Sequence, residues 1–209
     1  MIMLLSGATT FERGEHVGHL VVPKSWNRPE ALGLSPGRWA MDNGAFAGFD
    51  AGAFVRMLEA FHAYRGELFV TAPDVVGDAA ATAALWPFWS RLLLGTSRRP
   101  AYVVQDGITP DLLPDAPAYF IGGTTAFKES EQVARICAYA KARGIWVHWG
   151  RVNTKRRMAI AARAGVDSYD GTGWSMFPEA RVPKAIAWSH EIKSQPSFLD
   201  RTEAQHGQQ

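Results

Sequence analysis

Short apolar runs alternate with helical patterns along most of the chain. Eight of these runs have the length and the β-branched or aromatic content of strands. The predicted strands cover residues 1–5, 38–41, 68–72, 101–104, 118–121, 145–149, 167–169 and 184–188. Strands that alternate with helices are typical of α/β proteins with a parallel sheet.

Helical periodicity fills several of the intervals between these runs. Phe54, Met57, Leu58 and Phe61 recur at i, i+3, i+4 and i+7, which predicts an amphipathic helix. Similar patterns occur in three further segments, residues 78–94, 129–143 and 153–164. Pro87 is expected to kink or split the first of these three helices.

Eight strands joined by helices predict a small α/β barrel of the (β/α)8 or TIM type, or a distorted version of it. A doubly wound open sheet is the alternative, but no GxGxxG turn supports it. Residues 16–37 are rich in proline and glycine, so we expect a long loop there with an edge strand at residues 19–22. Residues 1–190 would then form one barrel domain, and the polar residues 191–209 are expected to fray.

Composition agrees with a single globular domain. The chain has 209 residues and 47% hydrophobic content, enough to bury a substantial core. Cys137 is the only cysteine, which excludes an internal disulfide and a multi-cysteine zinc site within one chain, and points to a reducing cytoplasm. The apolar run at residues 1–5 is too short for a signal peptide or a membrane span, so we expect no membrane partner.

The net charge of +2 is small, but the charges are distributed unevenly. Residues 132–166 hold eight Arg or Lys side chains and no Asp or Glu. Such a segment is either a phosphate-binding surface or a pair of solvated helix faces. Arg151, Lys155, Arg156 and Arg157 lie at a predicted helix start, where free N–H groups also favour anions, and they are the candidate phosphate contacts.

Polar or glycine-containing groups follow almost every predicted strand. They are Asp42-Asn43-Gly44, Pro73-Asp74, Gln105-Asp106-Gly107, Gly122-Gly123-Thr124, His148-Trp149-Gly150 and Asp170-Gly171. An Asp in such a place is most often a helix N-cap. In a parallel barrel, however, all these ends open onto the face that carries the active site. Carboxylates gathered there push their pKa values apart, which suits attack at a sugar carbon by one acid while another moves protons.

These groups lie in five motifs: MDNGAF, TAPDVVGD, VVQDG, IGGTTAFKE and HWGRVNTKRRMAIAARAGVDSYDG. In this order they resemble the tRNA-guanine transglycosylases, and more closely the small phage-type relatives that place 7-deazaguanines in DNA. MDNGAF is similar to the family's DSGGF, VVQDG to VQGG, and IGGTTAFKE to the GGLAVGE loop. TAPDVVGD stands where a base-reading Asp follows a strand, and the last motif is similar to MGVGTPEDL…A…GIDMFDC. The resemblance covers roughly residues 39–175.

The resemblance implies roles for the three acids. Asp170 would be the nucleophile that attacks C1′ of the target nucleotide, expels guanine and leaves a covalent glycosyl-enzyme. Asp42 would be the general acid/base that protonates the departing base and deprotonates the incoming one. Asp74 would read the base edge, because guanine and 7-deazaguanines present N1–H and N2–H side by side and a carboxylate can accept both.

The same resemblance implies further base contacts. Gln105 and the backbone of Gly122 and Gly123 would bind the O6 side of the base, and Phe46 and Trp149 would sandwich its two faces. Each has a structural alternative, since the aromatic pair could be core residues and the two glycines a tight turn. His148, within a strand-like run, is read as structural, although it could touch the substrate.

Two departures from the family pattern shape the expectation. The tRNA enzymes carry a zinc site of three cysteines and a histidine, which Cys137 alone cannot supply, so DNA becomes the expected substrate in place of tRNA. GTGWSMFPEAR replaces the family's C-x-x-PTR pattern, and Arg181 within it is a candidate for a phosphate role.

We therefore expect a cofactor-free, metal-free cytoplasmic enzyme that exchanges guanine in DNA for a free 7-deazaguanine of the preQ0 type, and that could form a homodimer. The alternatives are exchange on tRNA or another RNA, hydrolysis by a nucleic-acid glycosylase, and a non-catalytic nucleic-acid-binding module. A divalent-metal hydrolase is disfavoured, because no HxH or paired-histidine spacing accompanies the acids.

Overall fold

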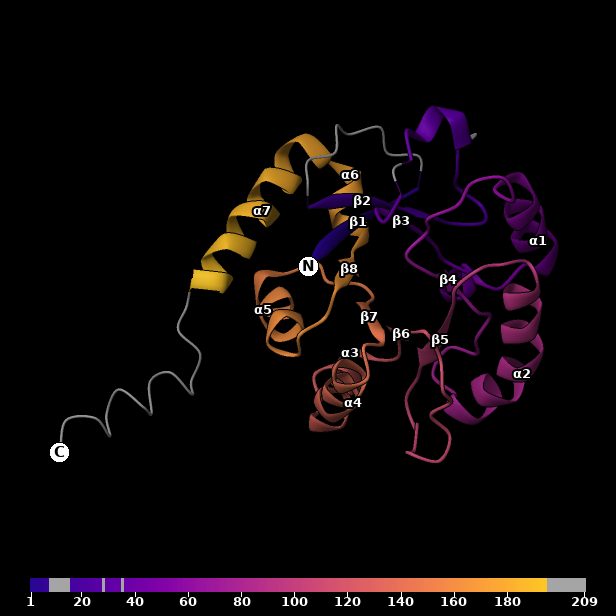
Figure 1. Cartoon of the computed structure of the whole chain (residues 1–209). Helices are drawn as coiled ribbons and strands as arrows, with labels where there is room; N and C mark the ends of the chain where they lie inside the picture. Colours follow the sequence, from indigo (N-terminus) through magenta and orange to yellow (C-terminus); the bar gives the residue numbers. More distant parts are fainter. Residues whose placement is uncertain (8–15, 28, 35, 195–209) are drawn as a thin grey trace.

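The predicted (β/α)8 barrel is confirmed. The computed structural model describes residues 1–7, 16–27, 29–34 and 36–194. Eight parallel strands pair in sequence order, and β1 pairs with β8 to close the barrel (Figure 1). The strands are β1 (Ile2–Ser6), β2 (Val17–Val21), β3 (Trp39–Met41), β4 (Val70–Thr71), β5 (Pro100–Val104), β6 (Ala118–Ile121), β7 (Trp146–Trp149) and β8 (Ser168–Asp170).

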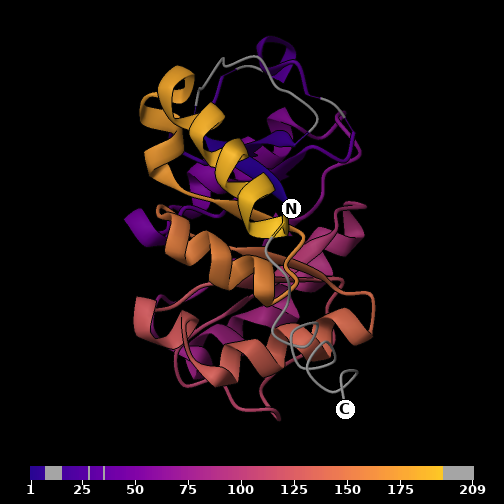
Figure 2. The ribbon, with the colours of Figure 1, turned by 90° about the vertical axis from the view of Figure 1, so that its left-hand side faces the viewer.

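Helices cover the outside of the barrel. They are α1 (Ala51–Ala60), α2 (Ala79–Gly95), α3 (Thr125–Lys128), α4 (Glu131–Ala142), α5 (Lys155–Arg163), α6 (Thr172–Met176) and α7 (Pro178–Ser194), with short 3-10 turns η1 (Pro29–Leu32) and η2 (Ala45–Ala47). Side-chain oxygens cap five of the helices: Asp50, Asp78, Thr124, Ser130 and Thr154 each accept from a backbone N–H in the first turn. Helix α7 lies beside α5 on the outside of the barrel (Figures 1 and 2).

The strand prediction needs correction at two places. The edge strand expected at residues 19–22 is present as β2, but it is an inner strand, because it pairs with both β1 and β3 and all its residues are buried. Gly18 lets β2 pack closely against its neighbour, because a Cβ there would lie 2.2 Å from the carbonyl oxygen of Arg38. The predicted strand at residues 184–188 is helical and belongs to α7, since Val182 and Ala185 are buried one turn apart against the outer core.

Two further expectations need correction. Helix α2 continues through Pro87 without splitting. Trp86 packs on Tyr102 and Trp89 packs on Phe54, so aromatic contacts anchor the helix on both sides of the proline. Residues 191–194, expected to fray, form the last turn of α7, and residues 195–209 of the predicted tail lie outside the described residues.

Two layers of core hold the barrel. Leu4, Leu20, Ala40 and Phe69 belong to one buried cluster, and the rings of Phe69, Phe120 and His148 pack together within it. Two larger clusters fill the space between strands and helices. Across the part of the chain that the structure describes, no helix has both the length and the apolar character needed to span a bilayer.

Candidate active site

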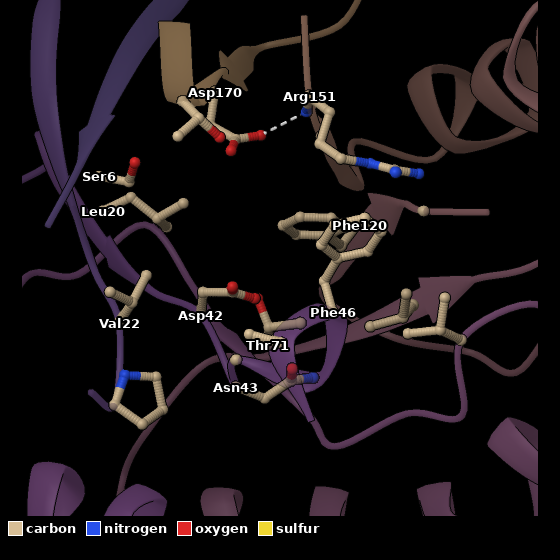
Figure 3. A pocket seen from close by; sticks show the side chains of 18 of the residues that line it. Ser6, Leu20, Val22, Asp42, Asn43, Phe46, Thr71, Phe120, Arg151 and Asp170 are labelled. Carbon is tan, nitrogen blue, oxygen red and sulfur yellow. Dashed lines mark hydrogen bonds between the residues drawn. The ribbon is translucent and has the colours of Figure 1, made fainter. Parts of the chain in front are cut away.

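A pocket of about 800 Å³ opens at the carboxyl ends of the strands. Asp42 follows β3, Asp74 follows β4, and Asp170 ends β8, and all three line this pocket. Figure 3 shows Asp42 and Asp170 at the same open space, with Leu20 and Phe120 on its walls. The volume falls within the range of roughly 300–1,000 Å³ typical of small-molecule sites.

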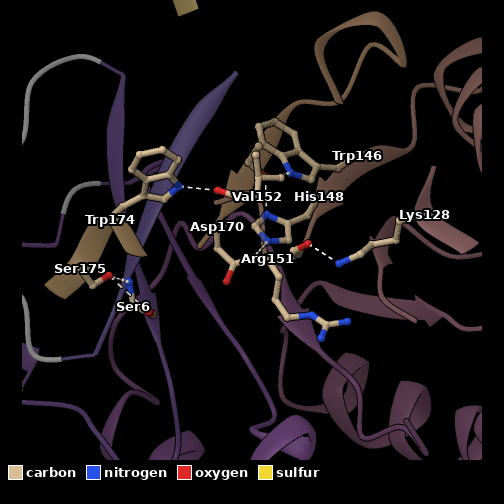
Figure 4. Close-up of polar contacts among 11 residues, drawn as sticks. Ser6, Lys128, Trp146, His148, Arg151, Val152, Asp170, Trp174 and Ser175 are labelled. Carbon is tan, nitrogen blue, oxygen red and sulfur yellow. Dashed lines mark hydrogen bonds and ion pairs between the residues drawn. The ribbon is translucent and has the colours of Figure 1, made fainter. Parts of the chain in front are cut away.

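The Asp170 carboxylate is held by one of its two oxygens. Oδ1 accepts a hydrogen bond of 2.8 Å from the backbone N–H of Arg151 and lies 3.4 Å from Nε2 of His148 (Figure 4). Within the described chain no group donates to Oδ2 of Asp170. The side chain is 13% exposed. One oxygen is therefore fixed, and the other remains available to a ligand.

A buried chain of hydrogen bonds sets the His148 ring. The indole N–H of Trp146 donates to Ser168 Oγ at 3.0 Å, and Ser168 Oγ lies 2.9 Å from His148 Nδ1. Because indole is only a donor, the serine oxygen accepts from it and can give its own hydrogen to Nδ1. We assign the His148 proton to Nε2 on this network, facing Asp170. The sequence prediction of a structural His148 omitted this contact.

Asp42 is the most perturbed acid of the pocket. Burial raises the pKa of Asp42 to about 7, assisted by the negative charges of Asp170 and Asp74, while backbone N–H groups of Asn43 and Gly44 oppose the rise. Gly44 adopts a φ of 76° beside Pro23, which gives the turn that brings these N–H groups to the carboxylate. A carboxyl with this pKa can both give and take a proton near neutral pH.

Two amides fix Asp74. Asn43 Nδ2 donates to Oδ1 at 2.7 Å, and Gln105 Nε2 donates to Oδ2 at 2.6 Å. The amides are themselves oriented, because Asn43 Oδ1 accepts from the N–H of Ala45 and Gln105 Oε1 accepts from the N–H of Gly77. Burial raises the pKa of Asp74 against these two hydrogen bonds. Each carboxylate oxygen keeps a lone pair for a donor on a ligand.

The glycine pair after β6 serves close packing. The N–H of Gly122 is occupied, because it donates to the carbonyl of Val104 at 3.0 Å; the expected contact of the Gly123 backbone with a base stays a prediction. A Cβ on Gly122 would lie 2.9 Å from Gln105 Nε2, and one on Gly123 would lie 2.3 Å from an oxygen of Asp106. Both glycines line the pocket; the missing side chain of Gly122 leaves room for the Gln105 amide, and that of Gly123 leaves room for Asp106.

The two predicted sandwich residues lie in different places. Phe46 is 68% exposed at the mouth of the pocket, where the Arg151 guanidinium lies 4.3 Å from its ring centroid. Trp149 is buried in the outer core and does not line the pocket. Strand side chains alternate, so His148 facing the barrel interior forces Trp149 outward. Phe120 is the second aromatic residue on the pocket wall.

The candidate phosphate contacts also separate. Arg151 lines the pocket, whereas Lys155, Arg156 and Arg157 do not. Lys155 pairs with Glu191, Arg156 pairs with Glu129 at 2.7 Å, and Arg157 lies 3.7 Å from Glu129. Arg181 donates to the carbonyl of Gly173 at 2.8 Å and is likewise outside the pocket lining. The predicted cluster is therefore an ion-paired rim with one arginine inside the site.

Sequence reasoning missed Lys128, which also lines the pocket. The residue is 3% exposed, and Nζ donates to the carbonyl of Gly150 at 2.7 Å. Burial, assisted by the nearby positive charge of Arg151, lowers the pKa of Lys128 to about 8. The sequence did carry one indication of a buried lysine, because Lys128 follows Ala126 and Phe127 shortly after the glycine pair. The sequence indicates no role for Asn43 beyond a turn, yet its side chain holds Asp74 by a hydrogen bond.

In the described chain, no group of three His, Cys, Asp or Glu side chains is arranged to hold a metal ion. Comparison of the chain with protein-family models gives no match, and a search of curated proteins gives none either.

Proposed function

We propose that the protein is a DNA guanine transglycosylase, which exchanges a guanine in DNA for a free 7-deazaguanine of the preQ0 type. One observation carries the proposal: Asp42, Asp74 and Asp170 line a single pocket, and the pKa of Asp42 is raised to about 7 there. Exchange at a sugar carbon needs this combination, since one carboxylate must attack while a second acid moves a proton.

In the first half of the reaction, Asp170 acts as the nucleophile. Its unbound oxygen, Oδ2, forms a bond to C1′ of the target nucleotide, and the bond from C1′ to N9 of guanine breaks. The electron pair of that bond stays on the departing base, and the protonated carboxyl of Asp42 supplies the proton that neutralises it. Free guanine and a covalent glycosyl-enzyme result.

The second half reverses these roles. The Asp42 carboxylate takes the N9 proton of the incoming 7-deazaguanine, whose nitrogen then bonds to C1′ and releases Asp170 as a carboxylate. One glycosidic bond replaces another, so no nucleotide hydrolysis is needed to drive the exchange. Asp74 recognises both bases, because its two fixed oxygens accept the adjacent N1–H and N2–H donors.

The choice of a nucleic acid as substrate is supported by the cations and rings at the mouth. Lys24 and Arg151 line the pocket, and the exposed ring of Phe46 stands at its entrance. A base must leave a duplex stack to reach such a site, and aromatic faces stabilise a flipped base. DNA is preferred over tRNA because the chain has a single cysteine and lacks the family's zinc ligands.

Trapping the covalent intermediate tests the proposal. The wild-type protein is incubated with guanine-containing DNA, denatured, and analysed for a protein–DNA adduct, in parallel with Asp170→Ala. We expect an adduct only with Asp170 present, and incorporation of labelled guanine into DNA by the same preparation. A wild-type protein that forms no adduct and exchanges no base would disprove the proposal.

The same assay separates the alternatives. Incorporation of label into RNA alone would identify an RNA enzyme, and release of guanine without incorporation would identify a glycosylase. Binding to DNA that is identical for Asp170→Asn and wild type, with no turnover in either, would identify a non-catalytic binding module.

A further inference from the structure

One peptide group connects the nucleophile of the proposed reaction to the buried lysine. The peptide between Gly150 and Arg151 directs its N–H to Asp170 Oδ1 at 2.8 Å. Its carbonyl oxygen accepts from Lys128 Nζ at 2.7 Å (Figure 4). An ammonium, a peptide dipole and a carboxylate are therefore aligned head to tail. Consecutive hydrogen bonds of this kind polarise one another and become stronger in a dry environment.

Lys128 has no carboxylate partner of its own. Its only hydrogen bond within the described chain goes to the Gly150 carbonyl, and none of the ion pairs there includes it. The charged groups that act on it are Arg151 and Arg157, which disfavour its positive charge, and Asp170 and Asp106, which favour it. Burying an unpaired ammonium is costly, so its placement calls for a compensating function.

The backbone at Arg151 is strained in a way that serves this alignment. Arg151 has a φ of 61°, a left-handed conformation that is unfavourable for a residue with a side chain. Because the peptide is trans, its N–H and its carbonyl point in opposite directions, so the N–H faces Asp170 while the carbonyl faces Lys128. The guanidinium of Arg151 is also held, by the carbonyl of Gly123.

We propose that Lys128 is a positioning residue, whose positive charge acts through the peptide between Gly150 and Arg151 to hold Asp170 as an oriented nucleophile. This inference rests on the proposed function for its catalytic consequence. The hydrogen bond fixes Oδ1 of Asp170 and directs Oδ2 into the pocket. The ammonium makes the Arg151 N–H a stronger donor than an ordinary amide, which stabilises the carboxylate without placing a cation in contact with it.

The first test needs no activity and uses NMR of the whole protein. In an Asp42→Asn background, which removes the carboxyl with a pKa of about 7, the Arg151 amide proton is followed from pH 6 to pH 10. Because the pKa of Lys128 is about 8, we expect this proton to move upfield as pH rises through that value. Adding Lys128→Met should move it upfield below pH 8, where Lys128 is charged, and abolish the titration. Lys184→Met, which removes an exposed lysine of α7, is the control and should change neither.

The second test is kinetic. With DNA at saturating concentration, Lys128→Met should slow formation of the covalent adduct by about 10-fold to 100-fold, the range expected for a lost charge-assisted hydrogen bond. The dissociation constant for DNA should stay within about twofold of wild type, and Lys184→Met should match wild type in both measurements.

These arms separate the possible failures. An Arg151 amide proton that ignores both pH and Lys128→Met would overturn the positioning role, whatever the activity. Weaker DNA binding with an unchanged adduct rate would also overturn it, and would instead identify Lys128 as a phosphate contact. If the wild-type protein forms no adduct while the amide responds as expected, the proposed function fails and the structural coupling stands. The titration of the Asp42→Asn protein, in which Lys128 is intact, still tests the coupling if Lys128→Met does not fold.

Discussion

At the scale of single residues, the three acids differ in how their oxygens are held. Asp170 has one oxygen bound and one open, Asp74 has an amide on each oxygen, and Asp42 carries the pKa raised to about 7. On the proposed mechanism, these environments suit Asp170 as the nucleophile, Asp74 as the base reader and Asp42 as the proton carrier. The sequence placed the acids at strand ends but contained no information on which oxygen would be occupied, because the donors come from other loops.

Asp42→Asn should change both stability and reactivity. The pKa of Asp42 is raised from 3.8 to about 7, so the fold favours the protonated form. The corresponding stability is fully present below pH 4 and is lost as pH rises toward 7. We therefore expect Asp42→Asn to increase the melting temperature at pH 8 by roughly 5 °C and to leave it unchanged near pH 4.

In the same variant, base exchange should fall at least about 100-fold, because the amide cannot accept a proton from the incoming base. Calorimetry and the labelled-guanine assay measure the two effects. A variant that exchanges base at the wild-type rate would remove Asp42 from the proposed mechanism.

Asn43→Ala tests the reading of the base edge. It removes the donor to Asp74 Oδ1 and leaves the Gln105 donor in place, so only one of the two carboxylate oxygens remains fixed. We expect the KM for the incoming 7-deazaguanine to rise about 10-fold with a smaller loss in kcat. Steady-state kinetics at fixed DNA concentration provide the measurement, and a pure loss of kcat would contradict the assigned role of Asp74.

At the scale of elements, register decides which side chain enters the site. The motif around residues 148–151 was identified from the sequence, but the pocket receives Arg151 and the inward face of β7 presents His148 in place of Trp149. A shift of one position reverses every side chain on a strand, and short strands rich in aromatic residues do not specify that position from their pattern. The hydrophobic run at 184–188 was equally ambiguous between strand and helix.

Gly18→Ala should destabilise β2 and the barrel with it. The new Cβ would lie 2.2 Å from the Arg38 carbonyl oxygen and 2.7 Å from Leu4, against backbone that cannot move freely. We expect a loss of about 3 kcal/mol in the free energy of unfolding, measured by urea denaturation. Gly95→Ala is the matched control, since a Cβ at this end of α2 meets nothing within 4 Å and should be neutral or slightly stabilising.

Glu129→Gln tests whether the ion-paired rim at α5 faces DNA. Glu129 pairs with Arg156 and lies close to Arg157, so removing its negative charge leaves both arginine charges without this counter-charge. If DNA lies across this rim, its affinity should rise about threefold to tenfold at low salt, and the dependence of binding on salt concentration should steepen. Filter binding at several salt concentrations measures both. An unchanged affinity and slope would place DNA elsewhere on the protein.

At the scale of the whole molecule, the alternation of strands and helices was sufficient to predict a (β/α)8 barrel, and closure of the sheet explains why acids so distant in sequence share one pocket. Lys128 and its link to Asp170 could not be predicted in this way. That link depends on the position of one peptide carbonyl and on the left-handed backbone of Arg151, neither of which leaves a pattern in residue type.

Barrel closure also determines when the nucleophile is assembled. Leu4 of β1 stands opposite Asp170 of β8, so the strand that carries Asp170 pairs with the first strand of the sheet. A ribosome releases β1 long before β8, so β1 stays unpaired on that side until β8 has emerged. The pocket of the three acids is therefore complete only once β8 has paired with β1, and on the proposed mechanism a chain that stalls before β8 emerges can form no glycosyl-enzyme.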